Sequence, residues 1–268
     1  MGLVERQSIR NVVANYAGVL LGMVNKLFLF REWLTREEFG MTELLVTVMV
    51  LGSEFSQWGV TKVIFRFFPY YHGRGRREND FYGFVWVYTF GGILLLALGL
   101  LLLGPYITAA FAPNSPLFSG AYLWAIPMAI AYTLYRVGSS LSQSLLASVV
   151  PTFAYNVGQR LGQTLLMLAY HFHWLSFPGF VLCFVLTHFL PGLIIGLDLW
   201  RKKRLKWSLS TQMFRSRAGR LMIQYGAFSS LGEMTLVLIG RVDMLMLGWL
   251  AGEGVVGVYA IAFYISSL

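Results

Sequence analysis

AYLWAIPMAIAYTLYRVGSSLSQSLL, residues 121–146, is the stretch that decides the fold class. It is apolar over more than the roughly 20 residues that a membrane-spanning helix needs. One arginine, Arg136, stands inside it. Polar side chains accompany this arginine at helical spacings: Tyr132, Ser139, Ser140 and Gln143. An arginine at membrane depth is costly unless it faces protein, water or an anion. The stretch therefore predicts a membrane helix with a polar, inward-facing stripe.

The composition of the whole chain agrees with a membrane protein. Hydrophobic residues make up 57% of the chain and charged residues only 12%, whereas soluble domains carry roughly 25% charged residues. The single cysteine, Cys183, lies in an apolar segment and has no partner for an intramolecular disulfide.

Eight apolar segments predict an all-α, polytopic membrane bundle. They cover residues 11–30, 41–63, 81–103, 121–146, 152–170, 179–199, 221–247, and a last one from near Val256. The connectors before the second and eighth segments both run from a leucine through a glutamate to a glycine, at 34–40 and 250–257. Because transporters are often built from such repeats, we expect a six-helix lobe (1–200), a basic connector (201–220) and the first two helices of a second lobe (221–268). The chain is then a fragment of a longer protein. The alternative is a complete eight-helix protein.

Basic residues set the expected orientation. They collect before the first segment, at 74–77 and at 201–220, which all fall on one side of the membrane. By the positive-inside rule this side is cytoplasmic, and the N-terminus with it. Nucleic-acid binding is not expected, because the basic residues flank the spans and no reading motif accompanies them.

Cationic side chains inside the spans form the predicted site. Lys26 lies on a polar face of the first segment, and Arg160 repeats the pattern of Arg136 in the fifth. One interpretation is interhelical ion pairing, and the other is a cationic cavity for an anionic head group. Phosphate suits the second, because its oxygens match arginine geometry. The predicted substrate-binding residues are Lys26, Arg136, Arg160, Gln143 and Asn156.

Two acids are predicted to balance charge or to couple transport to a proton or sodium ion. Glu54 is the deepest carboxylate of the first six segments, and we expect it to pair with Lys26 or Arg136. Asp243 stands near the outer end of the seventh segment.

Motifs for catalysis are not found in the sequence. It contains no nucleophile motif, P-loop, dinucleotide fingerprint or cysteine–histidine metal signature. The loops are short, and the longest expected outer loop is 104–120. We therefore expect no cofactor, no metal and no enzymatic activity.

Three motifs resemble one family of membrane proteins. Asp243-x4-Gly248-x3-Gly252-x4-Gly257-x-Tyr259-x2-Ala262, Glu38-Phe39-Gly40 and Gly59-x6-Arg66-x2-Pro69 are similar to segments of Wzx-type polysaccharide and O-antigen flippases. These belong to the multidrug/oligosaccharidyl-lipid/polysaccharide exporter superfamily. The resemblance covers essentially the whole chain, as the first eight of typically twelve to fourteen helices.

The resemblance implies two lobes around a central cavity that opens to each side in turn. The substrate class would be polyprenyl-diphosphate-linked saccharides, moved to the outer leaflet of a bacterial inner membrane. Relatives use intramembrane Arg and Lys to receive the diphosphate. We expect Arg136 and Arg160 to lie at one level, in the cytoplasmic halves of their helices, as a loading site. The alternatives are a cation-coupled multidrug exporter of the same fold and, from another class, a membrane-embedded glycan polymerase or acyltransferase.

Overall fold

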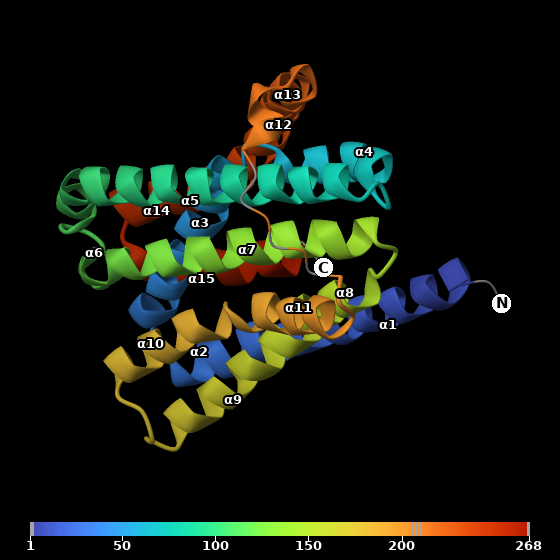
Figure 1. The fold of residues 1–268 in the computed structure, drawn as a ribbon. Coiled ribbons are helices and arrows are strands. Elements are labelled where there is room, and N and C mark those ends of the chain that lie inside the picture. The colour runs from blue at the N-terminus through green and yellow to red at the C-terminus, as the bar shows by residue number, and fades with distance from the viewer. Residues whose placement is uncertain (1–2, 205, 207, 209–210, 267–268) are drawn as a thin grey trace.

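The computed structural model describes residues 3–204, 206, 208 and 211–266, and within these ranges all regular structure is helical (Figure 1). Six helices of the described chain are long and apolar enough to cross a membrane. The predicted all-α membrane bundle is thus confirmed. The long helices lie side by side and turn back at two opposite ends of the bundle. We call the end that holds the N-terminus the N-terminal face, and the other the distal face.

The first predicted span forms one continuous helix from the N-terminal to the distal face. It consists of α1 (Leu3–Met23), the π-helical turn η1 (Val24–Leu29) and α2 (Phe30–Trp33). Asn25 and Lys26 stand in the π-helical turn. Such turns often occur at functional sites.

The second predicted span is helical but broken. α3 (Arg36–Gln57) starts with a capping box, in which Thr35 Oγ1 accepts from the Glu38 amide and Glu38 Oε2 accepts from the Thr35 amide. The helix ends at Trp58 and Gly59, which both have left-handed backbones, before α4 (Val60–Tyr71). A Cβ on Gly59 would overlap the carbonyl group of Gly226. Position 59 therefore requires glycine for two reasons, its left-handed backbone and the close approach of Gly226.

The third and fourth spans exceed their predicted lengths. α5 (Arg76–Phe111) continues for two turns past the predicted end and is followed by α6 (Pro116–Ala121), η2 (Tyr122–Trp124) and α7 (Ala125–Ser144). The prediction of a long outer loop at 104–120 is therefore wrong. Pro105 lies inside α5, as membrane helices tolerate, and Pro116 occupies the first turn of α6, where its missing N–H has no partner to lose.

The fifth and sixth predicted spans lie below the fourth, α7, in Figure 1. α8 (Val149–Phe153), η3 (Ala154–Gln159) and α9 (Arg160–His171) follow one another as a single helix. This helix carries several polar residues and is not one of the six helices that are long and apolar enough to cross a membrane. α10 (Phe177–Thr187) and α11 (Leu190–Arg201) are separated at His188 and Phe189.

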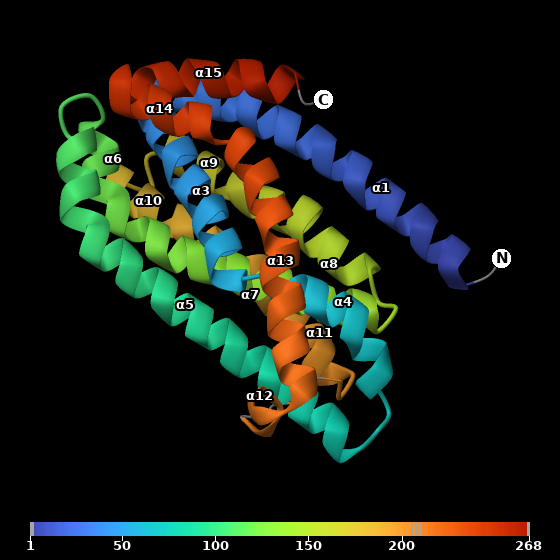
Figure 2. The same cartoon turned by 90° about the horizontal axis from the view of Figure 1, so that it is seen from above.

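The seventh predicted span is not one helix. After the connector come α12 (Gln212–Arg215), α13 (Arg217–Ile239), α14 (Val242–Leu250) and α15 (Glu253–Ser266). The break falls at Gly240 and Arg241. Residues 205, 207, 209 and 210 of the predicted connector lie outside the described residues. Figure 2 shows α13 crossing over α3 and α4.

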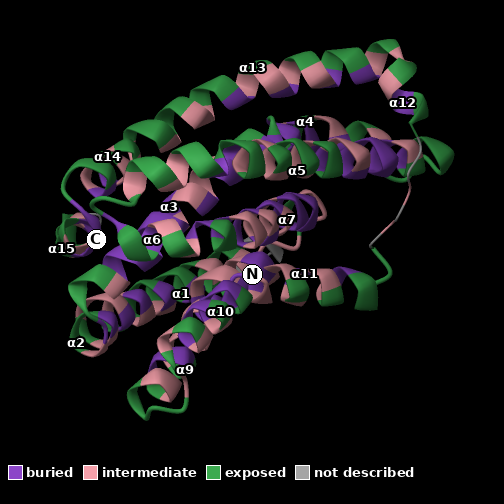
Figure 3. Cartoon of the chain, turned by 90° about the vertical axis from the view of Figure 1, so that its left-hand side faces the viewer, coloured by how far each residue is buried: buried purple, intermediate pink, exposed green. Residues whose placement is uncertain are grey.

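α3 is the central helix of the molecule, and the apolar core is built around it and α7. One cluster joins α3 to α6, α7, α10, α14 and α15 near the distal face. A second joins α4, α5, α7 and α13 near the N-terminal face. Burial is concentrated on α3 and α7, whereas α13 is mostly exposed or half-buried (Figure 3). Charged residues of α3 are therefore held at the centre of the bundle.

Candidate functional site

Two buried acids on α3 organise the charges inside the bundle. Glu43 is 3% exposed and Glu54 is 5% exposed. They are eleven residues apart, which corresponds to about 16 Å along a helix that rises 1.5 Å per residue. Each acid pairs with a cation from a different helix. The intramembrane charges are therefore arranged in two layers.

The distal layer surrounds a cavity of about 260 Å³. Lys26 Nζ lies 2.8 Å from Glu43 Oε1, and both residues line the cavity together with Arg160 and Arg241. Uncharged polar side chains also belong to the lining, and the rest of it is apolar; the polar ones are Tyr155, Gln159, Gln163, His188 and Tyr264. Lys26 also stands over the Tyr264 ring, 5.5 Å from its centre. Three cations thus face one carboxylate, and the described lining is positively charged.

The polar face of the first helix makes room for Arg160. The guanidinium donates to the carbonyl oxygen of Gly18, and a Cβ on Gly22 would overlap it. The backbone of Arg160 is also tied to η1, because Asn25 Nδ2 donates to its carbonyl oxygen at 2.8 Å. The glycines and asparagine that the sequence places on one face therefore hold this arginine against the first helix.

The second layer, nearer the N-terminal face, contains Arg136. Its Nη2 lies 3.1 Å from Glu54 Oε1 and 4.0 Å from Glu233 Oε1. Glu233 in turn pairs with Lys62, Nζ to Oε1 at 2.7 Å. Two cations and two acids alternate, so this group is electrically balanced. It joins α3, α4 and α7 to α13.

The structure therefore divides the predicted cationic set. Lys26 and Arg160 meet at the cavity, whereas Arg136 belongs to the balanced layer with Glu54. The expected loading site of Arg136 and Arg160 is therefore not one group of contacts, because Arg136 pairs with Glu54 whereas Arg160 lines the cavity with Lys26 and Glu43. The fifth span packs along α1 through the contact of Arg160 with Gly18.

The other predicted site residues make helix contacts. Gln143 Nε2 donates to Ser139 Oγ on its own helix at 2.9 Å. Asn156 Nδ2 donates to Asn15 Oδ1 at 2.6 Å and so joins η3 to α1. Asp243 Oδ2 accepts from the hydroxyl of Tyr259, and its Oδ1 accepts from the amide of Met244.

Four charged residues with a place in these layers were not predicted as site residues: Glu43, Lys62, Glu233 and Arg241. Each is an ionisable residue within an apolar segment, which is the signal that could have identified it. Glu233 and Arg241 come from α13 and the break that follows it, so both layers include residues from the last part of the chain.

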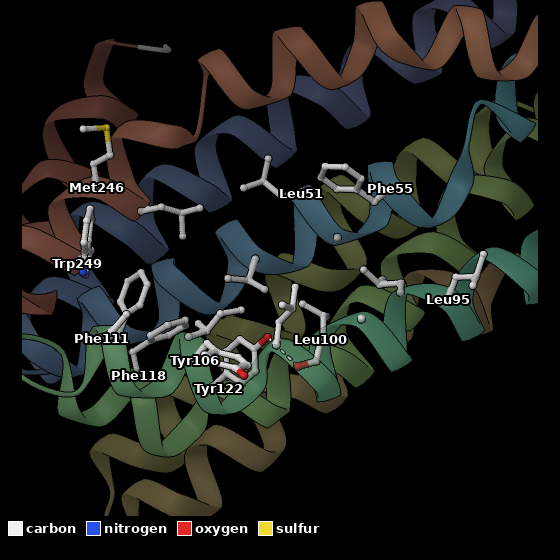
Figure 4. Close-up of a pocket in the computed structure, with 18 of the residues that line it drawn as sticks. Leu51, Phe55, Leu95, Leu100, Tyr106, Phe111, Phe118, Tyr122, Met246 and Trp249 are labelled. Atoms are coloured by element: carbon white, nitrogen blue, oxygen red, sulfur yellow. Dashed lines mark hydrogen bonds between the residues drawn. The ribbon is translucent and has the colours of Figure 1, made fainter.

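A larger pocket of about 820 Å³ lies between α3, α5 and α14 (Figure 4). Its walls are apolar and aromatic, and they include Phe55, Leu95, Phe111 and Trp249. The Tyr122 hydroxyl in its wall donates to the Leu100 carbonyl oxygen. Among the described lining residues none is charged, so this pocket suits hydrocarbon and not an anionic group.

A multi-pass helical membrane protein with paired charges and a cationic cavity inside the bundle is the class that the fold and site define. The chain belongs to the polysaccharide biosynthesis protein family, the Wzx-like flippase family of the multidrug/oligosaccharidyl-lipid/polysaccharide exporter superfamily, because the family model matches residues 4–268. The resemblance inferred from the motifs is thereby confirmed. No curated protein and no solved structure matches the chain.

Proposed function

We propose that this protein moves polyprenyl-diphosphate-linked saccharide from the cytoplasmic to the outer leaflet of a bacterial inner membrane by alternating access, with its N-terminus in the cytoplasm. The observation that carries the proposal is the excess of cations around the distal cavity. The step is transport without covalent change, so the protein acts as a transporter and not as an enzyme.

The chemistry of the cavity fits a diphosphate head group. Lys26 has Glu43 as its partner, but no described carboxylate lies within ion-pair distance of Arg160. Its guanidinium is held by a neutral carbonyl group instead. Diphosphate oxygens are charged acceptors, and they form stronger hydrogen bonds with arginine than a carbonyl oxygen does. The saccharide and the polyprenyl chain remain outside this small cavity.

The balanced layer has a different role in this proposal. Arg136 and Glu54 neutralise each other and connect α3 and α7 to α13 through Glu233. In the proposed two-lobe arrangement, α1 to α11 form the first lobe and α13 begins the second. The layer then ties the lobes together, and breaking it accompanies their movement. A coupling proton or sodium ion would act on Glu54 or Asp243.

The rival functions fit the cavity less well. An exporter of organic cations needs an acidic binding surface, whereas the described lining carries three cations and one carboxylate. A glycan polymerase or acyltransferase needs a catalytic group at an accessible site. The only buried histidine in the described cavity lining, His188, is engaged with the Phe184 carbonyl oxygen at 2.9 Å.

The test is transport of a polyprenyl-diphosphate-linked saccharide in vesicles that contain the full-length protein. We expect Arg160→Gln and Lys26→Gln each to lower the initial rate by about tenfold or more, the usual effect of losing a charged hydrogen bond. Arg217→Gln, an exposed change at the start of α13, is the matched control. An unchanged rate in the double variant, at equal protein content, would disprove the proposal.

A further inference from the structure

We infer that Arg241, at the break between α13 and α14, is the second-lobe half of the head-group site, so that one diphosphate bridges the two lobes. This inference rests on the proposed function. Lys26 and Arg160 alone describe a site on the first lobe. Arg241 makes the site a joint one, which suits a ligand with two anionic groups.

The break places Arg241 at the cavity. α13 ends at Ile239 and α14 begins at Val242, so Gly240 and Arg241 form a turn inside an otherwise apolar span. Arg241 lines the same cavity as Lys26 and Arg160. Interrupted membrane helices commonly provide substrate sites in transporters, because their side chains and free backbone groups face a cavity and not lipid.

Arg241 has no acidic partner among the residues that the structure describes. Its guanidinium contacts the sulfur of Met244 at 3.8 Å, and a thioether is only a weak acceptor. The neighbouring acid Asp243 is occupied by Tyr259 and the Met244 amide. Glu43, the one carboxylate of the described cavity lining, pairs with Lys26 through Oε1, and its buried Oε2 makes no hydrogen bond to a described residue, Arg241 included.

The contrast with Arg136 shows what is missing at Arg241. Arg136 is half-buried like Arg241. Its guanidinium is flanked by Glu54 and Glu233. A guanidinium inside a membrane bundle is normally matched in this way. Around the cavity, Arg160 and Arg241 approach from opposite sides of the proposed lobe boundary without a matching acid. An incoming diphosphate supplies charged acceptors for both arginines.

A head group that bridges the two lobes also shifts the balance between their conformations. A ligand that binds both Arg160 and Arg241 favours the conformation in which α9 and the α13–α14 break are close. Release on the other side of the membrane then frees α13–α15 from the first lobe. A bound head group therefore directly stabilises the contact between the lobes.

The experiment compares purified full-length wild type with Arg241→Gln, Arg241→Lys, Arg160→Gln and the control Arg217→Gln. The probes are polyprenyl diphosphate, polyprenyl monophosphate and polyprenol. Binding is measured by titration, and hydrogen exchange is followed in α9 and in the α13–α14 break. Exchange without ligand identifies any variant that is misfolded.

We expect Arg241→Gln to weaken diphosphate binding by about tenfold and monophosphate binding by less than twofold. Diphosphate should protect both α9 and the α13–α14 break in wild type, and only α9 in Arg241→Gln, while Arg241→Lys recovers part of both effects. Diphosphate binding and protection of the break that are unchanged in Arg241→Gln would overturn the inference. If Arg160→Gln also binds normally, the proposed function fails as well. If Arg160→Gln alone is weakened, only the bridging role fails.

Discussion

Gly22 is the residue whose smallness matters most at the cavity. The place of a Cβ on this glycine is taken by the guanidinium of Arg160 and the hydroxyl of Tyr264. Any larger residue at this position must push the arginine away from α1. Gly18 and Gly22, four residues apart on one face of α1, therefore do more than permit close helix packing, because they also position a charge.

Gly22→Ala should lower the rate of transport by about tenfold, as loss of the Arg160 hydrogen bond would, without destabilising the helix, since alanine is the better helix former. Gly99→Ala on α5, where a Cβ meets nothing within 4 Å, is the control. Vesicle transport and thermal unfolding of both variants test this. Equal rates for the two variants would contradict the positioning role.

The Arg136–Glu54 pair offers a second test at the residue scale. Removing one partner of a fully buried pair costs about 3–5 kcal/mol. Here the Arg136 side chain is 29% exposed and keeps Glu233 nearby, so we expect Glu54→Gln to cost about 2 kcal/mol.

The double variant Glu54→Gln/Arg136→Gln should be more stable than Glu54→Gln alone, because no unpaired charge remains. Thermal unfolding in detergent measures both. Strictly additive losses would show that the two residues do not depend on each other.

At the scale of elements, α3 and α15 pack against each other through glycines at the distal face. A Cβ on Gly40 would overlap the carbonyl group of Glu253, and one on Gly257 would overlap the carbonyl oxygen of Arg36. The Glu253 carboxylate also accepts from the amides of Leu117 and Phe118, at 3.1 and 2.9 Å. The distal ends of α3, α6 and α15 are thereby held together.

Gly40→Ala should separate α15 from α3, because rigid backbone cannot yield as a side chain does. We expect a loss of stability of about 2 kcal/mol or more, visible as a lower unfolding temperature. Gly91→Ala, in open space on α5, provides the comparison. A Gly40→Ala protein as stable as that comparison would show that the contact can open without cost.

Glu253→Gln tests the carboxylate of the same contact separately from the glycines. An amide oxygen accepts a weaker hydrogen bond than a carboxylate, and the amide nitrogen cannot accept from a backbone N–H. We expect a loss of about 1–2 kcal/mol, measured by thermal unfolding. No change would mean that water or a neighbouring group serves the Leu117 and Phe118 amides equally well.

For the whole molecule, the orientation in the membrane is the property that can be tested most directly. After replacement of Cys183 by alanine, a cysteine at His173, on the distal face, should react with a membrane-impermeant maleimide added to intact cells. A cysteine at Arg74, on the N-terminal face, should react only after permeabilisation. The reverse pattern would invert the proposed orientation, and with it the direction of transport.

Much of the architecture could be predicted from local sequence. Apolar length predicted the helical segments, since a bilayer demands backbone hydrogen bonds within each segment. The breaks after Gln57 and Ile239 were missed because apolar length does not record a turn. The loop predicted at 104–120 was wrong because Pro105 and Pro116 stand where helices accept proline, and only the few residues around Pro113 form a turn. In each case the backbone conformation of a few residues within an apolar segment decided whether the helix continued or ended.

The sequence by itself determined that this chain is a helical membrane protein of its family and that Lys26, Arg136 and Arg160 stand inside its spans. Only the tertiary structure decided which acids those cations meet. Glu54 pairs with Arg136 and Glu43 pairs with Lys26, whereas Arg160 and Arg241 line a cavity. The physical reason is that membrane depth follows from composition along one helix, whereas an ion pair depends on the rotation and height of two helices, which only their packing fixes.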